Sequence, residues 1–353
     1  MGTVYRHLYD QVCDWENLMR AWRKARKGKR GRPPAATFEQ RAGEHLLEIQ
    51  AELQTERYRP GAYVSFYIHD PKHRLISAAP FRDRVVHHAL CNVIEPIFER
   101  RFIHDSYANR PGKGTHAALD RCQAFARRYR YVLPCDVAQF FPAIDHALLL
   151  ETIGRVVVDP AVLGLCATIL ASGRDVLRDE YAMHYFPGDD LLAALRPRGL
   201  PIGNLTSQFW ANVYLDRLDH FVKRELKCRA YVRYVDDFLL FADDKATLWA
   251  WRTAVIDFLA ALRLTLHEAR GHPQPVTEGI PFLGFVVYPD HRLLKRRKGI
   301  AYRRRLRALA SDFRARRVPA QRITASVRGW TNHARYGDTY ALRKRLLREA
   351  LRR

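Results

Sequence analysis

The chain has 353 residues, of which 48% are hydrophobic, and its 60 Lys and Arg against 37 Asp and Glu give a formal net charge of +23. This composition allows a sizeable buried core. No apolar run reaches the ~18 residues of a membrane-spanning helix, and the polar start excludes a secretory signal, so we expect a cytoplasmic protein.

The first third of the chain predicts helices and a pair of short strands. Apolar residues recur at helical spacing over residues 5–27, and the Gly- and Pro-rich stretch Lys29–Pro34 ends that helix. The other elements predicted here are helices over residues 38–56, 84–101 and 115–128 and alternating strands over residues 63–68 and 73–77.

The middle of the chain predicts buried strands between helices. Tyr131–Asp136 is a short apolar run that ends in a carboxylate, and two apolar runs around Val235-Asp236-Asp237 predict a hairpin over residues 231–241. Asn204 is expected to cap a helix over residues 205–226. The remaining predicted elements are helices over 145–158, 162–171 and 246–262, an irregular stretch over 172–198 and a strand over 282–287. This order indicates the α+β class.

Positive charge is concentrated in the predicted helical tail. Residues 291–353 hold 21 of the 60 Lys and Arg and three of the 37 acids, and a second basic cluster spans Trp22–Pro34. Basic stripes of this kind follow phosphates, which points to a nucleic-acid partner. The alternative is a solvated basic face without a ligand.

The six cysteines stand alone, without a Cys-x-x-Cys pair. This spacing argues against a zinc site and against a disulfide framework. We therefore expect reduced, structural thiols.

The sharpest segment contains the adjacent acids Asp236 and Asp237. Successive residues inside a strand point to opposite faces, but a tight turn lets both carboxylates reach one side. Such a pair is costly to bury unless cations neutralise it, and Mg²⁺ prefers carboxylate and phosphate oxygens. Asp136, at the end of its own strand, supplies a third acid for two metal ions, which could activate a 3′-hydroxyl and stabilise pyrophosphate. The other acidic pairs, Asp189–Asp190 and Asp243–Asp244, are interpreted as turn or cap residues.

Seven segments together resemble the motif series of reverse transcriptases, in order and over nearly the whole chain. They are DPKHRLISAAPFRDRVVHHAL, SYANRPGKGTHAAL, CDVAQFFPAIDH, GLPIGNLTSQFWANVYLD, YVDD, LRLTLHEAR and GIPFLGF. The resemblance implies a right-hand polymerase with fingers over residues 1–130, a ferredoxin-like palm with a four-stranded antiparallel sheet over 131–290 and a short, basic helical thumb over 291–353.

The resemblance also implies roles for single residues. Asp136 and Asp236 would be the principal ligands of two Mg²⁺ ions, for which Mn²⁺ can substitute, and Asp237 the third acid. Phe141 stands at the position of the family's steric gate against a ribose 2′-hydroxyl. Further nucleotide-binding positions are Lys72, Arg74, Ile202 and Gln208, and weaker positions for template contact are Arg110 and Lys113, whose alternative is a solvated loop.

Two departures refine the resemblance. Intron-type relatives carry Gln-Gly-x-x-x-Ser-Pro where this chain has Ile-Gly-x-x-x-Ser-Gln from Ile202 to Gln208. That form resembles the reverse transcriptases of diversity-generating retroelements, which copy a template RNA with errors at adenines. The family's last palm Lys aligns with Arg270, and an Arg hardly gives up a proton, which puts a general-acid role in doubt.

Three hypotheses follow for function. The first is the error-prone enzyme of a diversity-generating retroelement, working with template RNA, a primer 3′ end, dNTPs and a small basic helical-bundle accessory protein. The second is a stand-alone bacterial reverse transcriptase of another role, such as phage defence. The third is a polymerase-derived scaffold without activity, against which the retained acids and Phe141 argue.

Overall fold

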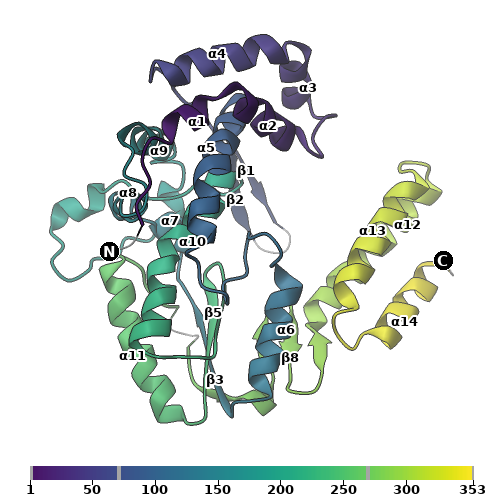
Figure 1. The fold of residues 1–353 in the computed structure, drawn as a ribbon. Coiled ribbons are helices and arrows are strands. Elements are labelled where there is room, and N and C mark those ends of the chain that lie inside the picture. Colours follow the sequence, from purple (N-terminus) through teal and green to yellow (C-terminus); the bar gives the residue numbers. More distant parts are fainter. Residues whose placement is uncertain (1–2, 70–72, 268–270, 352–353) are drawn as a thin grey trace.

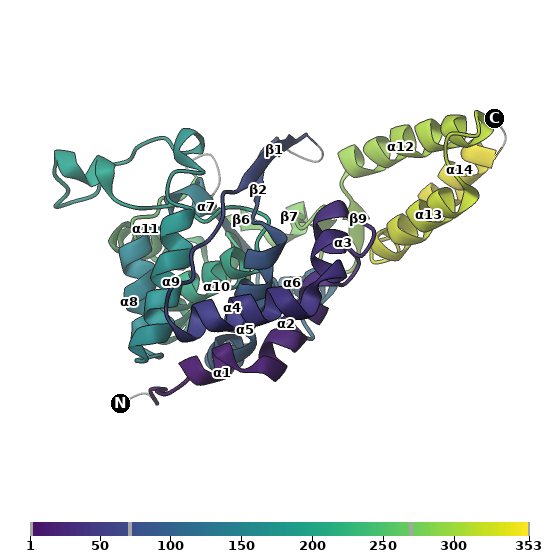
Figure 2. The same cartoon turned by 90° about the horizontal axis from the view of Figure 1, so that it is seen from above.

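The computed structural model describes residues 3–69, 73–267 and 271–351 of the chain. It is a mixed α+β structure with antiparallel sheets, which confirms the predicted class. Figures 1 and 2 show a body of sheets and helices with an arm, formed by the helices of residues 296–351, at its side.

The helices and strands have the following bounds. The helices are α1 Tyr9–Cys13, α2 Trp15–Arg26, α3 Pro33–Gln40, α4 Ala42–Gln54, α5 Phe81–Glu99, α6 Thr115–Ala126, α7 Phe140–Ala143, α8 His146–Gly154, α9 Pro160–Ser172, α10 Leu205–His220, α11 Lys245–Ala261, α12 Arg296–Arg314, α13 Ala320–Ala334 and α14 Tyr340–Leu351. Short turns of other helix types are η1 Arg178–Glu180, η2 Leu191–Leu195, η3 Phe221–Glu225 and η4 Val276–Glu278. The strands are β1 Val64–Ile68, β2 Arg74–Ala78, β3 Tyr131–Asp136, β4 Tyr231–Tyr234, β5 Asp237–Ala242, β6 Gln274–Pro275, β7 Ile280–Phe282, β8 Phe285–Val287 and β9 Arg292–Leu294.

The central sheet has the strand order β4-β5-β3-β6 and is antiparallel throughout. Its side chains alternate between two cores, because successive residues of a strand point to opposite faces. Leu133 and Phe238 enter the core formed with α5, α8 and α10. Val132 and Leu239 enter the core formed with α6, β7 and β8. Because a core covers each face of the central sheet, its strands carry apolar side chains on both sides.

The N-terminal helices are shorter than the sequence predicts. The continuous helix predicted over residues 5–27 is wrong, because the Asp14 side chain accepts a hydrogen bond from the Asn17 N–H at 3.0 Å and starts α2 afresh. The helix predicted over 38–56 is likewise two helices. Arg41 separates α3 from α4 with a non-helical φ of −129°.

Two later predictions need correction as well. The single strand predicted over residues 282–287 is the hairpin β7–β8, whose turn residues Leu283 and Gly284 have φ of 46° and 91°. Two positive φ values in a two-residue loop give the turn that matches strand twist. The helix predicted over residues 205–226 ends as α10 at His220 and continues as a π-helical turn, η3.

The secondary acidic pairs are turn and cap residues, as predicted. Asp190 caps η2 and Asp244 caps α11 through side-chain hydrogen bonds. Asp189 accepts a hydrogen bond from the Phe186 N–H at 3.0 Å, and Asp243 accepts one from the Arg130 N–H at 3.2 Å.

The arm consists of α12, α13 and α14 and has a small core of its own. Tyr302 stacks on Trp330 with ring centroids 4.2 Å apart, and Leu306 and Leu346 are buried beside them. The strand β9 pairs with β8, so the third sheet crosses residue 290, where the sequence places a domain boundary. That division stays a prediction.

The described residues agree with two simpler predictions. Within the ranges given above, no helix is long and apolar enough to cross a membrane. All six cysteines are buried free thiols.

Asn204 joins the β1–β2 hairpin to α10. It directly precedes α10, as predicted, but its side chain makes no cap hydrogen bond. It donates instead to the carbonyls of Ser77 and Pro201, at 2.9 and 3.0 Å, and accepts from the Ala79 N–H at 3.1 Å. Asn204 is 2% exposed, so these bonds are shielded from water.

We expect Asn204→Ala to lower the free energy of unfolding by about 1–3 kcal/mol, because it leaves the buried Ala79 N–H without its partner. Urea unfolding at neutral pH measures the change. The control is Gln208→Ala, on the exposed side of the same helix, which we expect to stay within about 0.5 kcal/mol of wild type. Equal stability of the two variants would contradict the bridging role.

Candidate active site

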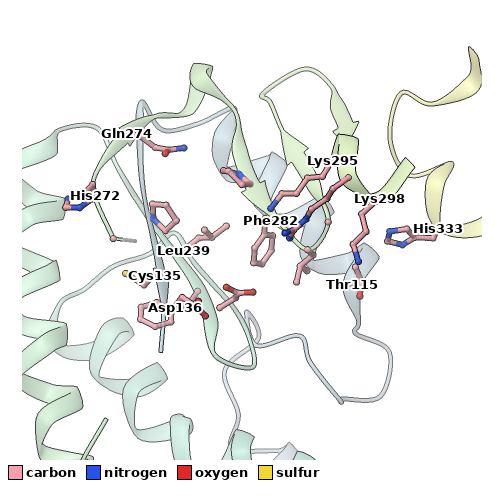
Figure 3. Close-up of a pocket in the computed structure, with 18 of the residues that line it drawn as sticks. Thr115, Cys135, Asp136, Leu239, His272, Gln274, Phe282, Lys295, Lys298 and His333 are labelled. Carbon is pink, nitrogen blue, oxygen red and sulfur yellow. The ribbon is translucent and has the colours of Figure 1, made fainter. Parts of the chain in front are cut away.

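The pairing of β3 with β5 brings two of the predicted acids together. Asp136 ends β3, Asp237 begins β5, and the two are partners across the antiparallel ladder. Directly opposite residues in such a ladder have Cβ atoms about 4.5–5.5 Å apart. Both residues are half-buried and line a cavity of about 600 Å³, which Figure 3 shows from close by.

Asp236 lies on the turn between β4 and β5. The preceding residue, Val235, has a φ of 58°, which a β-branched residue rarely adopts and which costs about 1–3 kcal/mol. The carbonyl of Asp236 accepts a hydrogen bond from the Val137 N–H at 3.2 Å. Asp236 is not among the residues that line the cavity. Nor do the described residues include a group of three His, Cys, Asp or Glu that could hold a metal ion.

A buried Arg side chain forms a hydrogen bond to the backbone of this turn. Arg233 is 0% exposed and donates to both carboxylate oxygens of Asp219, at 2.7 and 2.6 Å. Its third nitrogen donates to Asn212 Oδ1 at 3.2 Å and to the Val235 carbonyl at 3.1 Å. Tyr231 donates to Asp219 at 2.8 Å. The turn is therefore fixed to α10, which carries Asn212 and Asp219.

Burial and charge shift the pKa values of this network. Burial alone lowers the pKa of Arg233, but the Asp219 carboxylate outweighs burial and the net pKa is raised. Burial and the same carboxylate raise the pKa of Tyr231 well above its ordinary value. One turn earlier on α10, burial and the charge of Asp219 raise the pKa of Asp216 to about 7. The Asp219 carboxylate thus favours the charged form of Arg233.

Positive side chains line the part of the cavity nearest the arm. Figure 3 shows Lys295, Lys298 and His333 across the cavity from Asp136. Arg297 of α12 and Arg74 of β2 line it too. Acidic and basic groups therefore face one another across a space large enough for a nucleotide.

Among the predicted triphosphate-binding residues, Arg74 lies in this cavity. Lys72 and Arg270 fall outside the described residues. Arg74 belongs to β2, and the nucleotide-binding role of Lys72 stays a prediction.

The other predicted nucleotide contacts do not line the cavity. Phe141 is half-buried in α7 and packs against the main core. Ile202 is half-buried, and its carbonyl accepts a hydrogen bond from the Ser77 N–H at 2.8 Å. Gln208 is exposed on the first turn of α10. Their contacts with a nucleotide stay predictions.

The two weaker template-contact positions differ in their surroundings. The Arg110 side chain is 5% exposed, and its guanidinium binds the Glu99 carboxylate and the carbonyls of Ile103 and Ser106. Its donors hold the loop together and point away from solvent. Lys113 Nζ donates to the His104 carbonyl at 2.9 Å and remains partly exposed.

A comparison with protein families shows the family to which the chain belongs. The family model described as reverse transcriptase (RNA-dependent DNA polymerase) matches residues 69–287. The chain belongs to the reverse transcriptase family. The match includes β2, the central sheet and the hairpin with Asp236 and Asp237, whereas α1–α4, β1 and the arm lie outside it.

Individual relatives are similar over different lengths. Protein YkfC of Escherichia coli (strain K12) is 26% identical over an alignment of 292 positions that covers 71% of this chain and 72% of that protein. The group II intron-encoded protein LtrA of Lactococcus lactis subsp. cremoris is 26% identical over 182 residues, 51% of this chain but 28% of that protein. Nuclear intron maturase 1 of Arabidopsis thaliana is 32% identical over 105 residues, 30% of this chain and 15% of that protein. The chain thus spans a small part of the intron-related proteins.

Reverse transcriptases use divalent metal ions, and the acids of this chain suit them in chemistry. Asp136 and Asp237 offer carboxylate oxygens from paired strand positions, and hard cations such as Mg²⁺ take such ligands. Asp236 follows the strained residue of the adjoining turn, one peptide bond from Asp237. These three residues would hold the ions.

Arg233 itself was not predicted from the sequence to be functional. Its surroundings now predict that Arg233→Met lowers the free energy of unfolding by about 3–5 kcal/mol, because Asp219 is left buried and unpaired. The double variant Arg233→Met/Asp219→Leu should regain most of this loss, since an apolar pair replaces the ion pair. Urea unfolding tests both.

The matched control is Arg229→Met, an exposed Arg four residues before Arg233. We expect it to change stability by less than about 0.5 kcal/mol. If Arg233→Met were as stable as this control, the ion pair would not hold the hairpin.

Proposed function

We propose that the chain copies RNA into DNA by two-metal nucleotidyl transfer, with Asp136, Asp236 and Asp237 as the metal ligands. The observation that carries this proposal is the pairing of Asp136 with Asp237 in a cavity whose other side is lined by Arg and Lys. Acids for metal ions beside cations for a triphosphate are the charges that phosphoryl transfer needs.

In this proposal the chain is a right hand. The fingers are residues 1–130, the ferredoxin-like palm is residues 131–290 and the thumb is residues 291–353. The four-stranded antiparallel sheet around Asp136 supports the palm assignment. The three basic helices of the arm support a thumb that follows nucleic-acid phosphates.

The residues divide the work of the reaction. Asp136, Asp236 and Asp237 would hold the two ions, which would activate the primer 3′-hydroxyl and stabilise the departing pyrophosphate. Arg74, together with Lys72, binds the incoming triphosphate through charge-assisted hydrogen bonds. Phe141 occupies the space that a ribose 2′-hydroxyl would need and so selects dNTPs. Lys113, near the exposed end of its loop, contacts template RNA, while Arg110 shapes that loop.

Loss of one carboxylate should abolish synthesis without unfolding the protein. Asp136→Asn and Asp236→Asn remove a charge and keep the shape, and we expect each to slow primer extension on RNA more than a hundredfold, about 3 kcal/mol or more in the barrier. Single-turnover extension with Mg²⁺ measures the rate, and RNA binding should be retained.

The control for this pair is Asp243→Asn, in an acidic pair that lies at the far end of β5. Its rate should match wild type, because Asn keeps the acceptor for the Arg130 N–H. Extension by Asp236→Asn at a rate near wild type would show that the metal ligands are assigned wrongly.

Within the family, we propose that the chain is the error-prone enzyme of a diversity-generating retroelement and that it works with a small basic helical-bundle accessory protein. The support lies in Ile202 and Gln208, which give the Ile-Gly-x-x-x-Ser-Gln form. Gln at the position of Ile202 could hydrogen-bond the incoming nucleotide and hold a correct pair in register. Ile202 has no donor or acceptor in its side chain, so apolar contact alone shapes the site there.

We expect the enzyme to misincorporate opposite template adenine, and Ile202→Gln to lower that rate more than errors opposite other bases. One hydrogen bond is worth about 0.5–1.5 kcal/mol, which is roughly three- to tenfold in selectivity. Sequencing cDNA copied from a defined RNA, with any accessory protein supplied, gives the error spectrum. Ile202→Leu is the matched control and should keep the wild-type spectrum.

Equal wild-type error rates at all four template bases would remove the support for the diversity-generating role. The proposal would then change to a stand-alone bacterial reverse transcriptase of another role, such as phage defence. Primer extension itself would still stand.

A further inference from the structure

The segment between α9 and α10 is hydrogen-bonded to the short helix α7 and to the residues beside it. At its base, a Cβ atom on Gly173 would lie 2.6 Å from Pro201 Cγ, so the two ends of the segment touch and a side chain at residue 173 would not fit. The C-terminal end of the segment forms hydrogen bonds with the residues that follow Asp136. The Leu200 N–H donates to the Phe141 carbonyl and the Gly199 N–H to the Ile144 carbonyl, both at 2.9 Å.

Gln139 forms a second attachment to the same segment. Its side-chain amide donates to the Glu180 carbonyl at 3.0 Å and accepts from the Ala182 N–H at 3.1 Å. The amide thus pairs with the segment at two points, as one residue of a β-strand would. Gln139 has a left-handed backbone, with φ of 45° and ψ of 41°, which is costly for a residue other than Gly unless contacts hold it.

A third contact joins the segment to the β1–β2 hairpin. Tyr67 of β1 donates its hydroxyl proton to Glu180 Oε1 at 3.0 Å, and this carboxylate raises the pKa of Tyr67. The Tyr67 ring also stacks on His73, with centroids 4.4 Å apart. The hairpin that carries Arg74 is therefore linked through Glu180 to the residue three positions after Asp136.

We propose that Gln139 is a positioning residue for nucleotide selection, and that Tyr67 and Glu180 couple it to the β1–β2 hairpin. The inference rests on the proposed function, since it concerns selection of the incoming nucleotide. Gln139 lies between Asp136 and Phe141 in the chain, and its two hydrogen bonds fix the start of α7. The place of the Phe141 ring therefore depends on the segment outside the cavity.

The effect on catalysis follows from this geometry. If the two bonds are lost, α7 moves more freely and Phe141 excludes a 2′-hydroxyl less strictly. The enzyme should then bind dGTP less well and accept GTP more readily. A purely structural role would instead slow both nucleotides by the same factor.

The experiment measures kcat and KM for single dGTP and GTP additions to a primer on RNA. Gln139→Ala and Gln139→Gly both remove the amide, but Gly adopts the left-handed backbone at no cost. We expect both to lower the dGTP-over-GTP preference about three- to tenfold, mostly through a higher KM for dGTP. Gln40→Ala, an exposed Gln on α3, is the control and should keep the wild-type preference.

A double-mutant cycle tests the coupling to the hairpin. Tyr67→Phe keeps the ring and removes the hydroxyl, and Glu180→Ala removes its acceptor. Each should lower the dGTP-over-GTP preference, as Gln139→Ala does. The double variant Tyr67→Phe/Glu180→Ala should equal the stronger single variant, because each single variant already breaks the same hydrogen bond. Additive effects would overturn the coupling.

The outcomes separate this inference from the function on which it rests. A wild-type enzyme that does not extend primers, or an Asp136→Asn variant that does, overturns the proposed function. If wild type extends and both Gln139 variants keep its dGTP-over-GTP preference, Gln139 does not position the site. A preference lost in Gln139→Ala alone would assign the effect to backbone strain and overturn the role of the amide.

Discussion

The geometry of the candidate active site depends on one buried ion pair. Arg233 and Asp219 are both 0% exposed, and a charge at such a depth is tolerated because the partner and further hydrogen bonds compensate it. A shift of β4 by one residue would turn Arg233 to the other face of the sheet and leave Asp219 unpaired. The pair therefore fixes the register of the hairpin, and β5 in turn places Asp237 opposite Asp136.

The same pair explains how a strained turn persists. Val235 adopts a positive φ that its branched side chain disfavours, at a cost similar to that of one or two hydrogen bonds. Arg233 donates to the carbonyl of Val235, and the Val137 N–H donates to the carbonyl of Asp236. Both bonds act on the backbone of the turn itself. The adjacent acids Asp236 and Asp237 are thereby held at the end of the sheet, although two neighbouring carboxylates repel each other.

Local patterns in the sequence were sufficient for much of this fold. The strand Tyr131–Asp136 has the predicted bounds, and the hairpin around Asp236 follows from apolar runs on either side of a turn. Arg233 could not be recognised in the same way. In the run Tyr231–Tyr234 a single Arg reads as the solvent-facing member of an alternating strand, and its partner Asp219 lies on a separate helix. The signal that could have identified the pair is a single charged residue, Arg233, in an otherwise apolar strand that follows a helix with an acidic residue, Asp219.

Two further side chains show the same influence of the tertiary structure. Asn204 stands where a helix cap is expected, but a tertiary bridge to Ser77 and Ala79 takes its side chain. Arg110 belongs to a motif that resembles a nucleic-acid contact, and yet Glu99 and two carbonyls occupy its donors. Sequence patterns report which groups are available, whereas the fold decides which groups are already bound.

The positive charges of the chain lie in two environments, the cavity and the outer surface of α12–α14, and these environments have different physical consequences. Lys295, at the start of α12, is held by its backbone N–H to the carbonyl of Gly284 at 3.0 Å, and β9 is paired with β8 just before it. The backbone of Lys295, one of the cations at the cavity, is thus tied to the β7–β8 hairpin. The outer surface of α12–α14 carries its charges in full contact with solvent, where salt screens interactions beyond about 8–10 Å. Salt should therefore weaken the proposed hold of the arm on nucleic acid more than the hold of the cavity on a triphosphate, because the cavity charges act at short range and in part out of water.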